Sequence, residues 1–185
     1  MFTHSLAGCL IFLLFGEFFN FEISGWYLIC GVIAGMLPDI ISIFFTSQTT
    51  RFNHLHRDNI SHSILLPLII FFIIAFLNIQ LSIITLIAIL SHYLIDIIKI
   101  KIKNDKFNLF VLGWGLKLFY PFSKKQIMFF YKKNKCIYTQ KEIDQLIEQY
   151  GDKNWIKNLF FKPTVNALIE YLSLIITIIL IIKYF

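Results

Sequence analysis

The residues with the clearest chemical potential are His92 and Asp96, which begin and end the stretch HYLID. Residues four apart on a helix lie on the same face, so the imidazole and the carboxylate point the same way. Nitrogen and oxygen donors in this arrangement suit a divalent ion, with zinc favoured and manganese or iron as alternatives. A histidine–aspartate ion pair or a helix cap at a membrane edge is the other interpretation. The spacing leaves both open.

Two further histidines, His56 and His62, lie six residues apart in the segment HLHRDNISHSILL. A loop that runs into the start of a helix can present both rings to one site. Arg57 beside them carries a planar guanidinium that suits phosphate. Alternatively, Ser61 caps the following helix and His62 faces lipid headgroups. His54 falls outside this spacing, and we expect it at the surface.

Asp39 and His4 complete the set of candidate ligands. Asp39 follows Pro38 late in an apolar run. A carboxylate so deep in a hydrophobic segment is a functional candidate by default, although it could simply terminate the helix. His4 opens the first apolar run and has the weakest case when taken alone.

Several common catalytic motifs are absent from the sequence. It has no His-Glu-x-x-His, which argues against an intramembrane zinc protease. It also lacks a Gly-x-Ser-x-Gly elbow and a phosphate-binding glycine loop, which argues against an activated serine. The net charge of +6 does not indicate a nucleic-acid partner, because basic residues beside a membrane are explained by anionic lipid headgroups.

Composition indicates how these residues are positioned. Of the 185 residues, 57% are hydrophobic and only 15% are charged, and the mean hydropathy is +0.71. The apolar residues form blocks that approach the roughly 20 residues needed to cross a bilayer. We therefore expect an all-α integral membrane protein, a bundle of about four to five transmembrane helices. The expected spans are Ser5–Phe19, Gly25–Phe45, Ser63–Leu77, Leu81–Ile98 and Val165–Phe185.

Positive charge predicts the orientation of these spans. Of the 17 Lys and Arg residues, 14 fall between Lys99 and Lys162. Because cytoplasmic loops carry the excess of positive charge, this segment and the N-terminus are expected inside. The six candidate ligands then all lie on the cytoplasmic side: His4, Asp39, His56, His62, His92 and Asp96. Their placement on one side is the main argument from the residues for a shared site.

The chain divides into three expected parts. A four-helix membrane core that contains the site spans 1–98, a basic interfacial segment spans 99–164, and a C-terminal membrane helix spans 165–185. Within the basic segment, residues 127–131 and 135–138 could pair as a hairpin. Thr139-Gln140-Lys141-Glu142 has the capping-box pattern, which predicts a short amphipathic helix that ends near Gly151.

Several blocks, in this order, resemble a known family: Thr3-His4-Ser5-Leu6, Leu37-Pro38-Asp39, His56-Arg57 with Ser61-His62-Ser63, Ser91 to Asp96, and Gly115 to Phe122. The chain is similar over residues 1–125 to bacterial membrane-bound metal-dependent hydrolases, including the LexA-regulated inner-membrane members. That family is distantly similar to zinc-dependent phospholipase C.

The resemblance implies an inner-membrane hydrolase that acts on an ester or phosphoester, with a phospholipid as one such substrate. It also implies that the six residues named above are metal ligands or their close neighbours. His56 and Arg57 would serve the reaction, with Arg57 as the anion clamp. One departure is Ile41, which stands where the family often has a second aspartate. This loss supports the alternative of a non-catalytic protein, either a metal or proton carrier or a scaffold.

Overall fold

The computed structural model describes residues 2–45, 60–97, 103–104, 107–108, 116–123, 125–127, 136–142, 145, 161 and 165–185. By its contacts the chain divides into two compact units. Unit 1 comprises Met1–Ile40, Leu66–Tyr93 and Ile169–Phe185. Unit 2 comprises Ile41–Leu65 and Leu94–Leu168.

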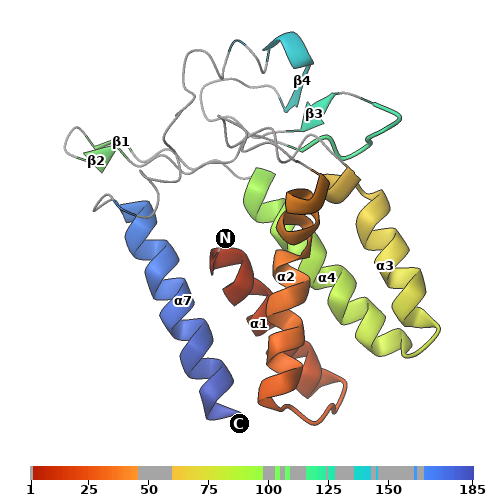
Figure 1. Ribbon diagram of the computed structural model, residues 1–185, viewed down its shortest axis with the longest axis vertical. Coiled ribbons are helices and arrows are strands. Elements are labelled where there is room, and N and C mark those ends of the chain that lie inside the picture. Colours follow the sequence, from red (N-terminus) through yellow and green to blue (C-terminus); the bar gives the residue numbers. More distant parts are fainter. Residues whose placement is uncertain are drawn as a thin grey trace. The chain divides into compact units, whose positions relative to one another are not determined.

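Each of the five apolar runs forms a helix (Figure 1). The helices are α1 (Phe2–Phe18), α2 (Gly25–Phe45), α3 (Leu65–Ala75), α4 (Ile79–Ile97) and α7 (Val165–Lys183), and the 3₁₀ turn η2 (Ile60–His62) precedes α3. Helix α4 begins two residues before the expected span, which started at Leu81. Asn78 accepts the Leu81 N–H at 2.9 Å and so caps α4, which already begins at Ile79.

Two helices, α2 and α4, are long and apolar enough to cross a membrane, over Gly25–Ser42 and Ile79–Ile97. Helices α1 and α3 are shorter apolar helices. The 11 residues of α3 rise only about 16 Å, against a hydrocarbon core of about 30 Å. The five expected helices are therefore present. Within the described ranges, α2 and α4 have the length and composition of a full membrane span.

The helices expose many large apolar side chains, while buried polar side chains share the interior with an apolar core. Polar side chains face inward: Ser42, Ser82, Thr85, Ser173 and Thr177 are buried. Large apolar side chains face outward: Leu14, Phe72, Ile73, Ile175 and Ile179 are exposed. This distribution is expected where the surroundings are lipid and polar groups find partners inside the bundle.

Helices α1 and α2 form a hairpin in unit 1. Asn20 has φ 57° and ends α1, and Phe21 N–H and Asn20 N–H bond back to the carbonyls of Gly16 and Glu17, as in a Schellman motif. Ser24 then caps α2 by accepting the Tyr27 N–H at 3.3 Å. The connection is short because both helix ends are satisfied locally.

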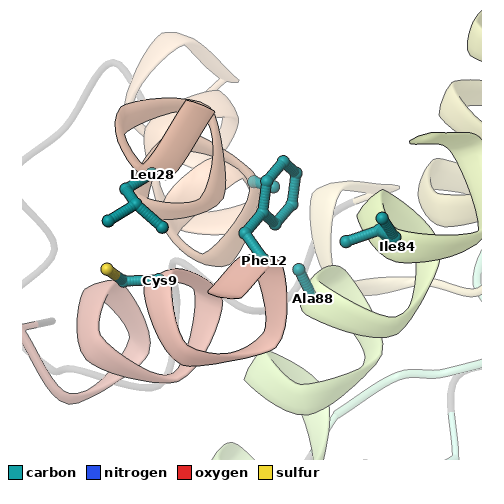
Figure 2. Close-up of a cluster of buried hydrophobic side chains, with 6 residues drawn as sticks. Cys9, Phe12, Leu28, Ile84 and Ala88 are labelled. Carbon is teal, nitrogen blue, oxygen red and sulfur yellow. The ribbon is translucent and has the colours of Figure 1, made fainter. Parts of the chain in front are cut away.

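Three glycines bring the backbones of α1 and α2 into contact. A Cβ on Gly31 would lie 2.8 Å from Gly8 O, and one on Gly35 would overlap the carbonyl oxygen of His4. Gly31 and Gly35 form a Gly-x-x-x-Gly pattern, which lets membrane helices pack closely. Phe12, Cys9 and Leu28 then form a core with Ile84 and Ala88 of α4 (Figure 2).

Helix α7 contacts both ends of this hairpin. Near its start, Glu170 accepts hydrogen bonds from Phe2 and Thr3 at the beginning of α1. At its end, Tyr184 O accepts the Gly25 N–H at 2.9 Å at the beginning of α2. Helix α7 therefore runs parallel to α1 and antiparallel to α2.

Unit 2 contains short strands. β3 (Gln126–Ile127) pairs antiparallel with β4 (Ile137–Tyr138), and Leu116 bridges to Ile127. The hairpin expected from the sequence is thus confirmed at these residues. A second pair, β1 (Lys103–Asn104) with β2 (Phe107–Asn108), was not expected.

The capping box is also confirmed. Glu142 accepts the Thr139 N–H at 2.9 Å, and Thr139 Oγ accepts the Glu142 N–H at 3.4 Å. The apolar face expected after it and its stop at Gly151 lie outside the described residues.

Candidate metal centre

Helices α1, α2 and α4 each contribute one side chain to a buried cluster of possible ligands in unit 1. His4, Asp39 and His92 each offer a ligand atom, and these atoms lie within 4.8 Å of one another. The residues are 5%, 8% and 0% exposed. Two imidazoles and a carboxylate match the three protein ligands of many catalytic zinc sites, so the donor set fits a metal ion.

The hydrogen bonds of His92 fix which ring nitrogen faces the cluster. Its Nδ1 lies 2.8 Å from the carbonyl oxygen of Gly35. Because a carbonyl only accepts, Nδ1 carries a proton and donates it. The other nitrogen, Nε2, faces Asp39 Oδ1 at 3.7 Å. A backbone carbonyl that accepts the second ring N–H is the usual way in which metal-binding histidines are oriented.

The distance between Nε2 and Asp39 Oδ1 is informative. At 3.7 Å it is longer than a hydrogen bond between nitrogen and oxygen, which spans about 2.7–3.2 Å. Two ligands of one tetrahedral ion, each about 2.1 Å from it, lie about 3.4 Å apart. A shift of a few tenths of an ångström would let both atoms bind the same ion.

His4 joins the cluster by stacking on His92. The ring centroids are 3.9 Å apart and the planes are inclined by 24°. A neutral ring is the state in which histidine binds a metal.

His62 and Asp96 form a similar pair in unit 2. His62 Nδ1 lies 2.9 Å from Ser61 Oγ, and its Nε2 lies 3.7 Å from Asp96 Oδ2. The two residues are 0% and 2% exposed. Each histidine thus has Nδ1 in a hydrogen bond and Nε2 at 3.7 Å from a carboxylate oxygen.

The turn that carries His62 is held by backbone contacts. Ser63 N–H and Oγ both donate to Ile60 O, and Ile64 N–H donates to Leu118 O at 2.8 Å. The sequence left open whether Ser61 caps a helix. In the structure it lies within η2, and its hydroxyl contacts the His62 ring.

The sequence-predicted residues divide into three groups. His4, Asp39 and His92 lie together, and His62 and Asp96 lie together. His56 and Arg57, with His54, lie outside the described residues. The idea that Asp39 ends its helix is wrong, because α2 continues to Phe45.

Sequence reasoning missed Gly35, whose carbonyl orients His92. The Gly31-x-x-x-Gly35 pattern could have indicated a helix contact there, but not which side chain the carbonyl accepts. Sequence reasoning also gave no role to Glu170, although an acidic residue in an apolar helix is a signal of function.

Comparison with known proteins places the chain in a family of membrane proteins. No curated protein and no solved structure matches the chain. The sequence model of a family described as YdjM inner membrane protein matches residues 1–184. The exposed apolar side chains of the helices and the two candidate spans agree with that description. Since the match covers nearly the whole chain, the chain belongs to the YdjM inner membrane protein family.

Proposed function

We propose that this chain is a membrane-bound metal-dependent hydrolase whose metal ion is held by His4, Asp39 and His92. The observation that carries the proposal is the 3.7 Å separation of His92 Nε2 and Asp39 Oδ1, on a ring whose Nδ1 already donates to Gly35 O. The mixed nitrogen and oxygen donors favour zinc, and they also accept manganese or iron.

Each ligand has a distinct task in this proposal. His92 is held in one tautomer by Gly35 O, and His4 is aligned by its stack on His92. Asp39 supplies the negative charge that a buried cation needs. Three protein ligands leave a position for water or substrate, and an ion held there would activate water and polarise a phosphoryl or carbonyl oxygen.

His62 and Asp96 offer a second pair of the same donor types, which we propose as a further ion-binding position. Ser61 would orient the His62 ring through Nδ1, as Gly35 O orients His92. Within α4, Asp96 follows His92 by one turn, so the two residues share a helix face.

We propose an ester or phosphoester as the substrate, at the inner leaflet of the membrane. The proposal rests on the resemblance to membrane-bound hydrolases and on the basic segment at 99–164, which suits anionic headgroups. Arg57 is the candidate clamp for the anionic group, and His56 is its candidate partner in the reaction.

A non-catalytic metal-binding or transport protein is the second candidate. The near-complete burial of the His4, Asp39 and His92 cluster favours it, because a substrate must reach a catalytic ion. Ile41 favours it too, since a second carboxylate is missing two residues after Asp39.

Metal analysis of detergent-purified protein tests the proposal, followed by a panel of phosphoesters and phospholipids with and without a chelator. Asp39→Asn and His92→Ala should lose the metal, whereas two controls should retain it. The controls are Ser82→Ala, which removes a buried hydroxyl on α4, and His54→Ala, which removes a histidine outside the motif. Metal without turnover would favour the second candidate. Protein without stoichiometric metal would refute both.

A further inference from the structure

Glu170 is a buried carboxylate that the metal cluster does not include. It lies on α7, is 9% exposed, and has the exposed residues Ile169, Tyr171 and Leu172 on either side. An acidic side chain costs free energy in an apolar helix unless it has partners or a task. In the described part of the chain, it belongs to neither group of possible metal ligands.

The partners of Glu170 are at the first turn of α1. Its Oε2 accepts the Phe2 N–H at 2.6 Å and the Thr3 N–H at 3.2 Å, and its Oε1 accepts the Thr3 hydroxyl at 3.1 Å. The first N–H groups of a helix have no acceptor within the helix. The first turn of α1 also contains no acidic residue. Glu170 therefore supplies, from another helix, the charge and the acceptors that an N-terminal cap provides.

His4 directly follows the capped residues. Its ring stacks on His92, and its own carbonyl lies against Gly35 of α2. The start of α1 is thus fixed on one side by Glu170 and on the other by the glycine contact. A residue held between two such contacts has little freedom to move its ring.

We propose that Glu170 is a positioning residue for the metal cluster, which acts by capping α1 and so holding His4 in place. This inference rests on the proposed function, because it assigns Glu170 a role in metal binding. In this proposal α7 contributes to the metal site through Glu170, although the Glu170 side chain is not itself a metal ligand.

The test compares Glu170→Ala and Glu170→Gln with Thr177→Val in detergent-purified protein. Thr177 is a buried residue two turns later on α7, and its hydroxyl bonds within the helix to Ser173 O. Zinc affinity is measured by competition with a chromophoric chelator. We expect Glu170→Ala to weaken zinc binding by about 10- to 100-fold, which is the usual effect of losing a group that orients a metal ligand. Glu170→Gln, which keeps one acceptor oxygen, should lose less, and Thr177→Val should stay within about twofold of the parent.

A double-mutant cycle separates positioning from general damage. If Glu170 acts through His4, then Glu170→Ala should cause no further loss of affinity in a His4→Ala background. Equal losses in both backgrounds would overturn the inference, because the effect would not pass through His4. An unchanged affinity in Glu170→Ala would overturn it as well.

Hydrogen–deuterium exchange makes the result independent of the proposed function. In metal-free protein, Glu170→Ala should speed exchange of the amides of residues 2–5 by at least tenfold, and Thr177→Val should not. If the parent binds no metal, the proposed function fails, and this exchange still reports on the cap. If exchange is unchanged in Glu170→Ala, the cap itself is wrong.

Discussion

Adding one methyl group at Gly35 should weaken metal binding, because it pushes against the residue that carries a ligand. A Cβ at this position would overlap the carbonyl oxygen of His4 and lie 3.1 Å from Gly8 Cα. Carbon and carbonyl oxygen rarely approach closer than about 3.3 Å, so α1 would have to move away by about 1 Å. Metal–ligand distances tolerate only about 0.2 Å.

The expected result follows from these magnitudes. Gly35→Ala should weaken zinc binding by at least about tenfold and lower the free energy of unfolding by about 1–3 kcal/mol, the usual cost of overpacking. Gly31→Ala should have a smaller effect, because its Cβ would lie 2.8 Å from Gly8 O and requires a shift of about 0.5 Å.

The assay is a zinc competition titration together with thermal unfolding of the metal-free protein in detergent. Gly25→Ala is the matched control, because it adds the same methyl group to the same helix. Its Cβ would meet the ring of Phe185, a side chain that can move, at the opposite end of α2 from Asp39. If Gly35→Ala bound zinc as tightly as Gly25→Ala does, the close contact between α1 and α2 would not position His4, and the reasoning would be refuted.

Three further predictions use different features. Stripping the metal with a chelator should lower the melting temperature, since zinc at 100 times its Kd stabilises the folded state by about 2.7 kcal/mol; an unchanged melting temperature in the parent would contradict metal binding. Ser61→Ala should lower the free energy of unfolding by about 1–3 kcal/mol in denaturant titrations, because His62 Nδ1 loses its 2.9 Å contact in a buried position. Ile175 lies near the middle of α7 on its exposed face, and Ile175→Asp should raise the free energy of membrane insertion by about 2.5–3.5 kcal/mol. The variant should therefore float less with membranes in a flotation assay, whereas Ile182→Asp near the helix end should integrate normally. Equal behaviour of the two variants would argue against lipid around α7.

Local patterns in the sequence predicted those parts of the fold that depend on neighbouring residues. The five helices follow from apolar runs, and the capping box at Thr139 and Glu142 follows from a four-residue motif. The third helix is shorter than its apolar run suggests, because the chain from Ile60 to Ile64 turns and bonds to Leu118 instead of starting the helix.

The candidate site was predicted by residue type but not by geometry. The sequence indicated His4, Asp39 and His92, and the structure places them within 4.8 Å of one another. It could not indicate that Gly35 orients His92, since the two residues are 57 positions apart and the acceptor is a backbone carbonyl. Such an acceptor is present at every residue, so its identity carries no signal.

The bond between Glu170 and the start of α1 also sets an order of events during synthesis. Phe2 and Thr3 leave the ribosome before their acceptor, which lies 168 and 167 positions later in the chain. At about 5–20 residues per second, the first turn of α1 remains without this acceptor for about 10–30 s. The contact that caps α1 can therefore form only after the chain has been made as far as Glu170 in α7.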